Sequence, residues 1–506
     1  MLSAIIPGNS LRKLTRNLLL TGLFFHLLAA WFNVGYHHPD EYFQITEFAS
    51  YKLGKTPVID LAWEYAAGIR PAFQPAMVYC LCKLFSLHNP VIISFLLRLL
   101  SAITAWAVAA LFILISLTEC RSDKTKKIIL YLSTVLWFLP YIHARFSSEN
   151  WSAIFFFAGL SLLMLMLKPA NDLLKIKNSF LSLLFCGILI GLSFVVRVQS
   201  GFMILGLGLW LLIYRKLTIR DLSVLFTGIA LSFFTGVLTD RWLYGKWVFT
   251  AFNYFHVNII IGKASDWGTS PWWDYFVTIV ENNIPPFGIL ILAGIFIFFF
   301  RFYKHPLTWI SVPFLLAHII NPHKEIRFLF PLVNALPVIA VTAFDGKTNS
   351  VFINKIIDSL SSKVAILSAK IFIVLNIILM LVTCMKPANE MFSFYDFVYD
   401  NYKDKEAYIY TFSEDPYSVI DLHVDFLKPD NLTVIKVPKD SLLHHFPFRK
   451  NAVNLVFEKK FLQDDAFHLT DKKSRIVYRT IPERMKMINF NNWLKRSRIW
   501  RLYEVD

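Results

Sequence analysis

Long apolar runs separated by short polar segments dominate the first 386 residues of the chain. The run 91–117 is longer than the ~20 predominantly apolar residues that a helix needs to cross a bilayer. We therefore expect residues 1–386 to form an all-α polytopic membrane domain, whose first span is retained rather than cleaved as a signal peptide. The pattern predicts eleven spanning helices, at 18–34, 90–118, 128–143, 151–167, 180–196, 202–214, 222–238, 285–300, 306–320, 328–344 and 364–384.

Two segments depart from this pattern. Residues 73–87 are short and mixed in polarity, which predicts an interfacial helix in the loop after the first span. The tail differs because residues 387–506 hold 37 charged side chains and short alternating runs at 407–412, 432–437 and 474–479, which predict strands. We expect a transmembrane catalytic domain at 1–386 and a small soluble α/β or α+β domain at 387–506.

The composition fits a membrane protein and changes the interpretation of the charge. The chain is 56% hydrophobic and 17% charged, whereas soluble domains carry about 25% charged residues. A net charge of +16 would suggest a nucleic-acid partner for a soluble protein. The tail, however, holds 19 basic and 18 acidic residues, so the excess positive charge lies almost wholly in the membrane domain. We therefore expect membrane lipids as a partner and no nucleic acid.

The distribution of basic residues predicts the orientation of the spans. With the N-terminus in the cytoplasm, 18 Lys and Arg fall in short inside segments and about 11 in longer outside segments, as the positive-inside rule requires. The same alternation places the chemically unusual polar segments and the tail outside. Because polar groups in membrane proteins mark functional sites, we expect one extracytoplasmic site, with contributions from 37–44, 145–150, 197–200, 239–275 and 323–327.

The polar segment after the first span carries a candidate base. Proline disfavours helix at the residue before it and starts a helix well, so Asp40 and Glu41 are expected in a first helical turn after Pro39. The helix dipole stabilises a carboxylate anion there, which suits a base rather than an acid. The alternative is that Asp40 is an ordinary first-turn charge at a membrane interface.

The short loop at 323–327 carries candidate phosphate ligands. His323, Lys324 and Arg327 provide up to three cations beside the membrane, and such groups bind the phosphate of a lipid-linked substrate. The alternative is that the side chains extend towards lipid headgroups. Arg197 is nearly enclosed by apolar sequence and needs an anionic partner, which is either a carboxylate such as Glu149 or a ligand phosphate.

Other chemistries find no support in the sequence. The chain has no Walker loop, no G-x-G-x-x-G turn after a strand and no D-x-D pair, and its five cysteines lack metal-ligand spacing. We expect no cofactor, and the requirement for a divalent ion stays open.

Two motifs together resemble the signatures of one family. The runs His38-Pro39-Asp40-Glu41-Tyr42-Phe43-Gln44 and His323-Lys324-Glu325-Ile326-Arg327-Phe328 are similar to those of the ALG9/PIG-B type mannosyltransferases, the dolichol-phosphate-mannose-dependent family of GT-C glycosyltransferases. The matching set covers about residues 36–337. Further matches follow in chain order: Trp63-Glu64-Tyr65, Gly68-Ile69-Arg70-Pro71, Arg145-Phe146-Ser147, Asp240-Arg241-Trp242-Leu243-Tyr244-Gly245, Asn253-Tyr254-Phe255 and Trp267-Gly268-Thr269-Ser270-Pro271-Trp272.

Within this family, the tail is most similar to the branch that adds the third mannose of GPI anchors. The run Tyr410-Thr411-Phe412-Ser413-Glu414-Asp415-Pro416-Tyr417-Ser418 resembles a tail segment of that branch. Thr411-Phe412-Ser413 stands where the branch has Pro-Cys-His. The acceptor therefore stays open between GPI and another glycan, as in a divergent or bacterial relative.

The resemblance implies a GT-C fold and an inverting transfer of mannose from a polyprenyl (dolichol-type) phosphate donor to a hydroxyl of a lipid-linked glycan acceptor. It implies an endoplasmic reticulum or bacterial inner membrane, with the site on the lumenal or periplasmic side. Asp40 would be the base, with Glu41 as runner-up or orienting partner. His323, Lys324, Arg327 and Arg241 would hold the donor phosphate. Weaker acceptor or sugar ligands are His38, Gln44, Trp63, Glu64, Arg70, Arg145 and Trp272.

Two other functions are compatible with the same features. The fold could transfer a different polyprenyl-phosphate sugar, because no residue by itself specifies mannose. A lipid-linked oligosaccharide transporter or flippase is the second alternative. Transporters place polar groups at mid-membrane and across repeats, whereas the polar groups of this chain cluster at one end of the predicted spans.

Overall fold

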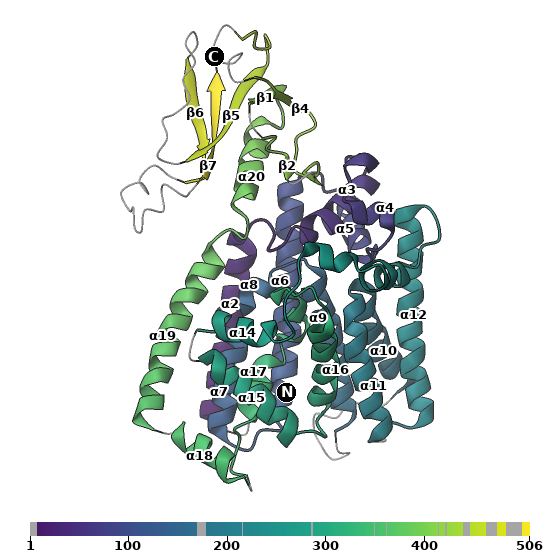
Figure 1. Cartoon of the computed structure of the whole chain (residues 1–506), viewed down its shortest axis with the longest axis vertical. Coiled ribbons are helices and arrows are strands. Elements are labelled where there is room, and N and C mark those ends of the chain that lie inside the picture. Colours follow the sequence, from purple (N-terminus) through teal and green to yellow (C-terminus); the bar gives the residue numbers. More distant parts are fainter. Residues whose placement is uncertain are drawn as a thin grey trace. The chain divides into compact units, whose positions relative to one another are not determined.

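The structure of the chain is a computed structural model that describes residues 8–168, 179–214, 216–284, 287–348, 350–360, 362–412, 414–419, 422–438, 446–461, 473–481 and 498–505, so that Ser413 lies outside the described residues. The chain divides into two compact units (Figure 1). The helical unit comprises Met1–Asn33, Glu64–Met77 and Leu96–Lys386. The tail unit comprises Val34–Trp63, Val78–Phe95 and Pro387–Asp506, so it joins parts of the first loop to the predicted soluble tail.

Helices of very different length build the first 386 residues. Most of them coincide with the apolar runs of the sequence. They are α2 (Asn9–Phe32), α3 (Glu47–Lys52), α4 (Trp63–Ala67), α5 (Phe73–Leu84), α6 (Pro90–Leu117), α7 (Asp123–Val135), α8 (Leu139–His143), α9 (Ser148–Met166), α10 (Phe180–Val196), α11 (Gly201–Ile213), α12 (Ile219–Tyr244), α13 (Thr250–Phe255), α14 (Asp274–Asn282), α15 (Phe287–Arg301), α16 (Pro306–Ile320), α17 (Leu336–Thr342), α18 (Val351–Ser359) and α19 (Lys363–Met385).

Helix α10 lies at the centre of the best-packed part of the helical unit, where it contacts both α9 and α12. Small residues allow this approach: a Cβ atom at Gly187 would lie 2.1 Å from the Leu225 carbonyl oxygen, and one at Gly228 would lie 2.3 Å from the Leu184 carbonyl oxygen. Close backbone contact through small residues is typical of helices that pack in membranes. The arrangement fixes the C-terminal end of α10, which carries Arg197.

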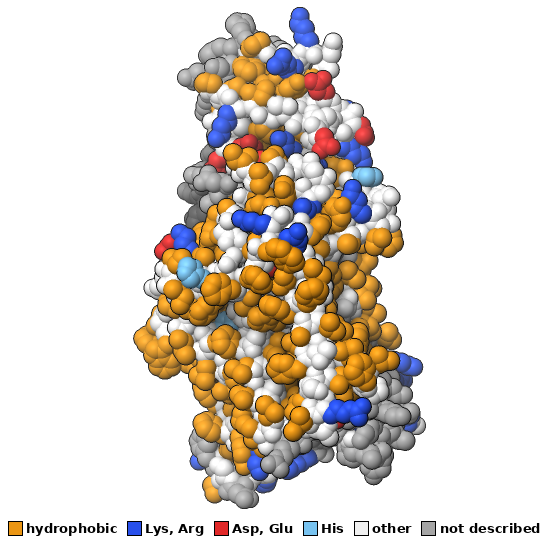
Figure 2. Space-filling model, turned by 90° about the vertical axis from the view of Figure 1, so that its right-hand side faces the viewer, with side chains coloured by type: hydrophobic (Ala, Val, Ile, Leu, Met, Phe, Trp, Pro, Cys, Tyr) orange, Lys and Arg blue, Asp and Glu red, His pale blue; other side chains and the backbone are white. Residues whose placement is uncertain are grey.

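Among the described residues, α2, α6, α9, α12 and α19 are each long and apolar enough to cross a membrane. The pair α15 and α16, bent by 120° at their junction, adds a sixth candidate when counted as one span. Large apolar side chains such as Phe226, Phe300 and Val364 are exposed on these helices, and Figure 2 shows hydrophobic side chains over much of the face in view. The predicted number of eleven spans stays a prediction.

Two of the predicted runs are broken rather than continuous helices. The run 128–143 contains the end of α7 and the short α8, separated by an extended Leu136. The run 328–344 contains the 3-10 helix Ile326–Leu332 followed by α17. Proline occurs in each run, as Pro140, Pro331 and Pro337, and proline removes a helical hydrogen-bond donor. The predicted helix at 73–87 is present as α5, whose 12 residues are too few to cross a bilayer.

The tail unit combines helices with a mixed sheet. Its tail portion contains α20 (Glu390–Tyr402), β1 (Ala407–Thr411), β2 (Ser418–Val419), β3 (Leu422–His423), β4 (Leu432–Lys436), β5 (Val453–Phe461), β6 (Ser474–Arg479) and β7 (Arg498–Val505). The five-stranded sheet has the order β4-β1-β5-β7-β6. Strand β1 pairs in parallel with β4 and β5, whereas β7 pairs antiparallel with β5 and β6. Strands are present at all three runs that the alternation predicted.

Helix α20 supplies the apolar layer on this sheet. The Phe394 ring centroid lies 5.6 Å from that of Phe457 and 5.1 Å from that of Trp500. Edge-to-face rings at such distances add to the free energy of simple area burial. The helix and sheet therefore share a compact aromatic core.

Candidate active site

Charged side chains meet where three helices of the helical unit begin or end. Helix α9 begins after Ser147, whose side chain accepts a hydrogen bond from the Asn150 backbone, and Glu149 lies in its first turn. Arg197 is the C-cap residue of α10. The loop 321–325 joins α16 to the 3-10 helix Ile326–Leu332, which carries Arg327. Each charge thus lies at the end of an apolar helix rather than within one.

A buried ion network joins these ends. Arg197 Nη1 lies 2.8 Å from Glu149 Oε1, and Arg327 Nη1 lies 3.3 Å from the same oxygen. Arg327 Nη2 donates to Glu325 Oε1 at 3.1 Å, and its Nε donates to Glu325 Oε2. Only 5% of the Arg197 side chain and 4% of the Glu149 side chain are exposed. The structural partner that the sequence offered for Arg197, Glu149, is therefore present.

One carboxylate does not satisfy the Arg197 guanidinium. Its Nε and Nη2 atoms are buried and have no hydrogen-bond partner among the described residues. The guanidinium also lies 5.5 Å from the Phe328 ring centroid. Buried donors are rarely left without a partner, so such a pair of atoms requires an explanation. Two adjacent guanidinium donors match the oxygens of a phosphate or carboxylate.

The loop at 323–327 is hydrogen-bonded to the Trp267–Trp272 segment, another predicted motif. Lys324 Nζ donates to the Ser270 carbonyl oxygen at 3.2 Å and to the Asn321 carbonyl oxygen at 2.7 Å. The Ser270 backbone donates in turn to the Pro322 carbonyl oxygen. Partial burial lowers the pKa of Lys324, and the nearby Asp274 carboxylate opposes that effect. The two motifs, about 50 residues apart in sequence, form one structural element.

His323 lies between two oxygen acceptors. Its Nδ1 is 3.0 Å from the Gly268 carbonyl oxygen, and its Nε2 is 2.9 Å from Glu325 Oε1. Only the doubly protonated imidazolium donates from both nitrogens. The structure therefore connects His323 and Arg327, through Glu325 and Glu149, with Arg197, which is outside the main phosphate-binding set predicted from the sequence. Lys324 lies on the same loop.

Arg241, the fourth predicted phosphate ligand, is exposed on α12 and lies 4.4 Å from the Trp247 ring centroid. That contact is a cation–π interaction. The structure groups Arg241 with the aromatic segment after α12. Its role in phosphate binding stays a prediction.

In the tail unit, Asp40 and Glu41 lie in the first turn of a helical segment that continues to Lys52. The Glu41 backbone donates to the His38 carbonyl oxygen at 3.0 Å, and the Tyr42 backbone donates to the Pro39 carbonyl oxygen at 3.0 Å. His38 Nδ1 lies 3.3 Å from Asp40 Oδ1. The predicted first-turn placement is confirmed, and about a quarter of the Asp40 side chain is exposed.

The weaker candidates have varied surroundings. Glu64 and Arg70 form an ion pair of 3.5 Å in the helical unit. Arg145 is buried, and its Nη2 donates to the Asn33 carbonyl oxygen at 2.6 Å, which ties it to the end of α2. In the tail unit Gln44 is buried and Trp63 is exposed, and in the helical unit Trp272 is exposed beside Trp273. Ligand roles for these residues stay predictions.

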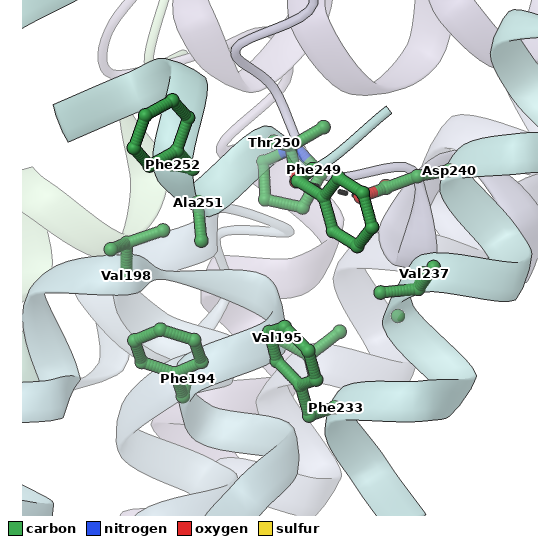
Figure 3. A pocket seen from close by; sticks show the side chains of 12 residues that line it. Phe194, Val195, Val198, Phe233, Val237, Asp240, Phe249, Thr250, Ala251 and Phe252 are labelled. Carbon is green, nitrogen blue, oxygen red and sulfur yellow. Dashed lines mark hydrogen bonds between the residues drawn. The ribbon is translucent and has the colours of Figure 1, made fainter. Parts of the chain in front are cut away.

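An apolar cavity of about 340 Å³ lies between α10, α12 and α13 (Figure 3). The Asp240 carboxylate at its edge accepts hydrogen bonds from the Ala72 backbone at 2.8 Å and from Thr250 Oγ1 at 2.6 Å. The lining is otherwise mostly hydrocarbon, from Pro71, Phe194, Val195, Val198, Phe233, Gly236, Val237, Phe249, Ala251 and Phe252.

Within the described ranges, no group of three or more His, Cys, Asp or Glu side chains could hold a metal ion.

Comparison with known proteins identifies the family. The model of the Alg9-like mannosyltransferase family matches residues 17–420. The chain belongs to this family. The resemblance indicated by the two sequence motifs is thereby confirmed, and the match includes both the charged network and the helical segment of Asp40.

Individual relatives of the family are distant. "Probable Dol-P-Man:Man(7)GlcNAc(2)-PP-Dol alpha-1,6-mannosyltransferase" of Schizosaccharomyces pombe is 30% identical over 33% of this chain and 31% of its own length. GPI mannosyltransferase 3 of Candida albicans is 24% identical over 58% of this chain and 56% of its own length. The chain thus spans less than two thirds of either relative.

A solved structure shows the fold. The match to ArnT from Cupriavidus metallidurans, solved with undecaprenyl phosphate bound, covers 97% of this chain and 97% of the ArnT chain. The sequence identity is 12% and the TM-score is 0.50. The family member described here therefore has the GT-C fold of that enzyme. Together with its long apolar helices, the fold identifies an integral membrane protein.

Proposed function

We propose that the protein is a mannosyltransferase. It transfers mannose, with inversion, from a polyprenyl-phosphate donor to a hydroxyl of a lipid-linked glycan on the extracytoplasmic side of its membrane. The observation that carries this proposal is the buried charged network of a mannosyltransferase family member, in which two guanidinium nitrogens of Arg197 have no hydrogen-bond partner in the described part of the chain.

The donor phosphate occupies this network. Arg197, Arg327 and Lys324 are balanced by Glu149, Glu325 and the Asp274 carboxylate near Lys324, so an imidazolium at His323 would leave one net positive charge. Binding of a phosphate monoanion or dianion would offset that excess. Arg197 Nε and Nη2 would donate to two phosphate oxygens, a geometry that a lysine cannot reproduce.

The same cations favour the chemical step. When the acceptor oxygen attacks the anomeric carbon, the bond from that carbon to the phosphate oxygen breaks and the phosphate keeps the electron pair. Fixed cations stabilise the developing charge without having to reorganise. The leaving phosphate then needs no proton from a carboxylic acid, in contrast to the leaving group of most glycosidases.

Asp40 is the proposed base, which takes the proton of the acceptor hydroxyl. The assignment rests on its chemistry: a partly exposed carboxylate in a first helical turn, with His38 beside it. A helix N-terminus favours the ionised carboxylate that a base requires. Glu41, the next residue of the same turn, is the alternative base or an orienting partner.

The apolar cavity between α10, α12 and α13 suits a chain of isoprene units. Its lining contains four phenylalanines and offers few polar groups, and the Asp240 carboxylate is already hydrogen-bonded to Ala72 and Thr250. A polyprenyl phosphate has a hydrocarbon tail that such a surface can cover. We assign this cavity to isoprene units of the donor tail beyond the two nearest the phosphate.

Transfer by purified protein in detergent tests the proposal. Polyprenyl-phosphate mannose and lipid-linked glycan acceptors are incubated with wild type, Asp40→Asn and Lys324→Ala, and the mannosylated product is measured. We expect transfer by wild type and a strong loss in both variants. Wild-type turnover in both variants would overturn the mechanism. A flippase would transfer no sugar in detergent, because transport requires two compartments.

A further inference from the structure

Glu47 is a buried carboxylate in the helical segment that begins at Asp40. Only 1% of the residue is exposed, although Asp40 and Glu41 on the same segment are partly exposed. The segment contains a π-helical turn, Tyr42–Thr46, directly before Glu47. Burying a carboxylate is costly unless its oxygens are hydrogen-bonded. The position therefore calls for specific partners.

Both carboxylate oxygens of Glu47 have such partners within the tail unit. Oε2 accepts a hydrogen bond from Thr56 Oγ1 at 2.7 Å. Oε1 accepts one from the Phe426 backbone nitrogen at 3.1 Å. Thr56 belongs to the first loop, whereas Phe426 belongs to the tail, 379 positions away from Glu47. One side chain thus joins the Asp40 segment to a tail loop.

Further contacts surround this connection. The Ala388 and Asn389 backbones donate to the Val34 carbonyl oxygen at 2.9 and 3.1 Å, at the other end of the loop. The Tyr42 ring lies 4.9 Å from the Phe392 ring of α20. Lys55 Nζ lies 3.4 Å from Asp430 Oδ1, whose side chain is 89% exposed. The loop is therefore attached to the tail at several points, and the Glu47 side chain is a fully buried polar contact among them.

We propose that Glu47 is a positioning residue for the transfer reaction and that the tail sets the orientation of the helical segment carrying Asp40 through it. This inference rests on the proposed role of Asp40 as the base. It gives the tail a direct role in turnover, beyond that of an accessory domain.

The geometry of the segment supports this role. Asp40 and Glu47 lie on one continuous helical run, so rotation or fraying of the run at Glu47 also moves the Asp40 carboxylate. Reacting groups must be held within a fraction of an ångström, and a displacement of about 1 Å can lower a rate about a hundredfold. A side chain with two fixed hydrogen-bond partners supplies such a restraint without itself touching the substrate.

Kinetic constants of Glu47 variants in the full-length protein test the proposal. Glu47→Ala removes both hydrogen bonds, and we expect kcat to fall tenfold or more while the KM for the polyprenyl-phosphate donor changes less than twofold. Glu47→Gln keeps an oxygen for the Phe426 nitrogen, and its amide can donate to Thr56 Oγ1. We expect this variant to retain at least half of the wild-type kcat.

Glu458→Ala is the matched control. Glu458 is fully buried in β5, where it pairs with Arg501 and Lys460 and accepts a hydrogen bond from Tyr503. Its loss destabilises the tail sheet without removing a contact to the Asp40 segment, so kcat per folded molecule should stay unchanged.

Amide hydrogen exchange supplies a second readout. Protection over 42–52 should fall in Glu47→Ala and persist in Glu458→Ala.

The outcomes separate this inference from the proposed function. Wild-type kcat and exchange in Glu47→Ala would overturn it, and so would an equal loss of kcat in Glu458→Ala. Failure of Glu47→Gln to restore turnover would also overturn it. If Asp40→Asn is as active as wild type, the assignment of the base fails first, irrespective of the result for Glu47.

Discussion

Arg197 and Glu149 form a buried ion pair of 2.8 Å in which the carboxylate engages only one of the three guanidinium nitrogens. Glu149 has a second arginine partner, because Arg327 Nη1 lies 3.3 Å from the same oxygen. Glu149 is thus shared by two buried arginines, of which Arg327 has a further carboxylate partner in Glu325. This incomplete pairing of Arg197 underlies the first two predictions.

Replacement of Arg197 by lysine should weaken donor binding. Lysine keeps the charge and can still pair with Glu149, but it cannot present two adjacent donors to phosphate oxygens. We expect the KM for polyprenyl-phosphate mannose to rise about tenfold, equivalent to ~1.4 kcal/mol. Steady-state kinetics of purified Arg197→Lys measure this value. Arg301→Lys, at an arginine that binds the Ala343 and Asp345 carbonyl oxygens of a different helix end, should leave the KM unchanged.

Replacement of Glu149 by glutamine should lower the thermal stability of the folded protein. Removal of one member of a buried ion pair leaves the other charge uncompensated, at a cost of about 3–5 kcal/mol. We expect a lower thermal midpoint for Glu149→Gln in detergent, with recovery when polyprenyl phosphate is added, because a bound anion replaces the missing charge. A midpoint equal to that of wild type would contradict the importance of this network.

The stability of the tail unit should fall as the pH rises through neutrality. Burial raises the pKa of Glu47 to about 7, despite hydrogen bonds from Thr56 and Phe426 that favour ionisation, and Asp425 adds to the increase. A carboxyl with a raised pKa in the folded state binds its proton more tightly there. Its stabilisation is therefore complete below the unfolded pKa near 4.5 and is lost through about pH 7, on the order of 3 kcal/mol. Unfolding midpoints across pH 5 to 8 should flatten in Glu47→Gln.

Filling the cavity between α10, α12 and α13 should change the preference of the enzyme for the length of the donor's polyprenyl chain. In Ala251→Phe, the added ring would occupy space assigned to the isoprene units. We expect the KM for a long polyprenyl donor to rise several-fold, while a donor with two isoprene units is used as by wild type. Val277→Phe, at an exposed position of α14, serves as a control. Equal effects on both donors would exclude the assigned occupant.

Local sequence signals predicted much of the fold. Apolar runs marked helices such as α6, α10 and α19, and alternation marked β1, β4 and β6. The breaks before α8 and α17 do not interrupt the apolar runs, because Pro140 and Pro337 are themselves apolar. Hydropathy alone therefore predicted continuous helices there. In strands β5 and β7, the buried positions include the charged residues Glu458 and Arg501, which pair with each other. The alternation of apolar and polar residues that marks a strand is therefore obscured in their sequences.

For the candidate site, short-range chemistry was predictable and long-range pairing was not. The composition of 323–327 indicated cations suited to a phosphate, and the apolar surroundings of Arg197 indicated an anionic partner. No local pattern could show that Glu149 would satisfy that arginine only in part. Likewise, the contact between Glu47 and the Phe426 backbone joins positions that only the three-dimensional fold brings together.

The π-helical turn at Tyr42–Thr46 makes the length of the chain as important as its composition. An α-helix advances about 100° per residue, and a π-turn accommodates one additional residue within an otherwise α-helical path. Deleting any single residue here would let the segment relax to a regular α-helix. Asp40 would then keep nearly the same direction around the axis relative to Glu47, whereas one residue inserted into the α-helical part of the run would rotate Asp40 by about that angle, although every charged side chain is still present.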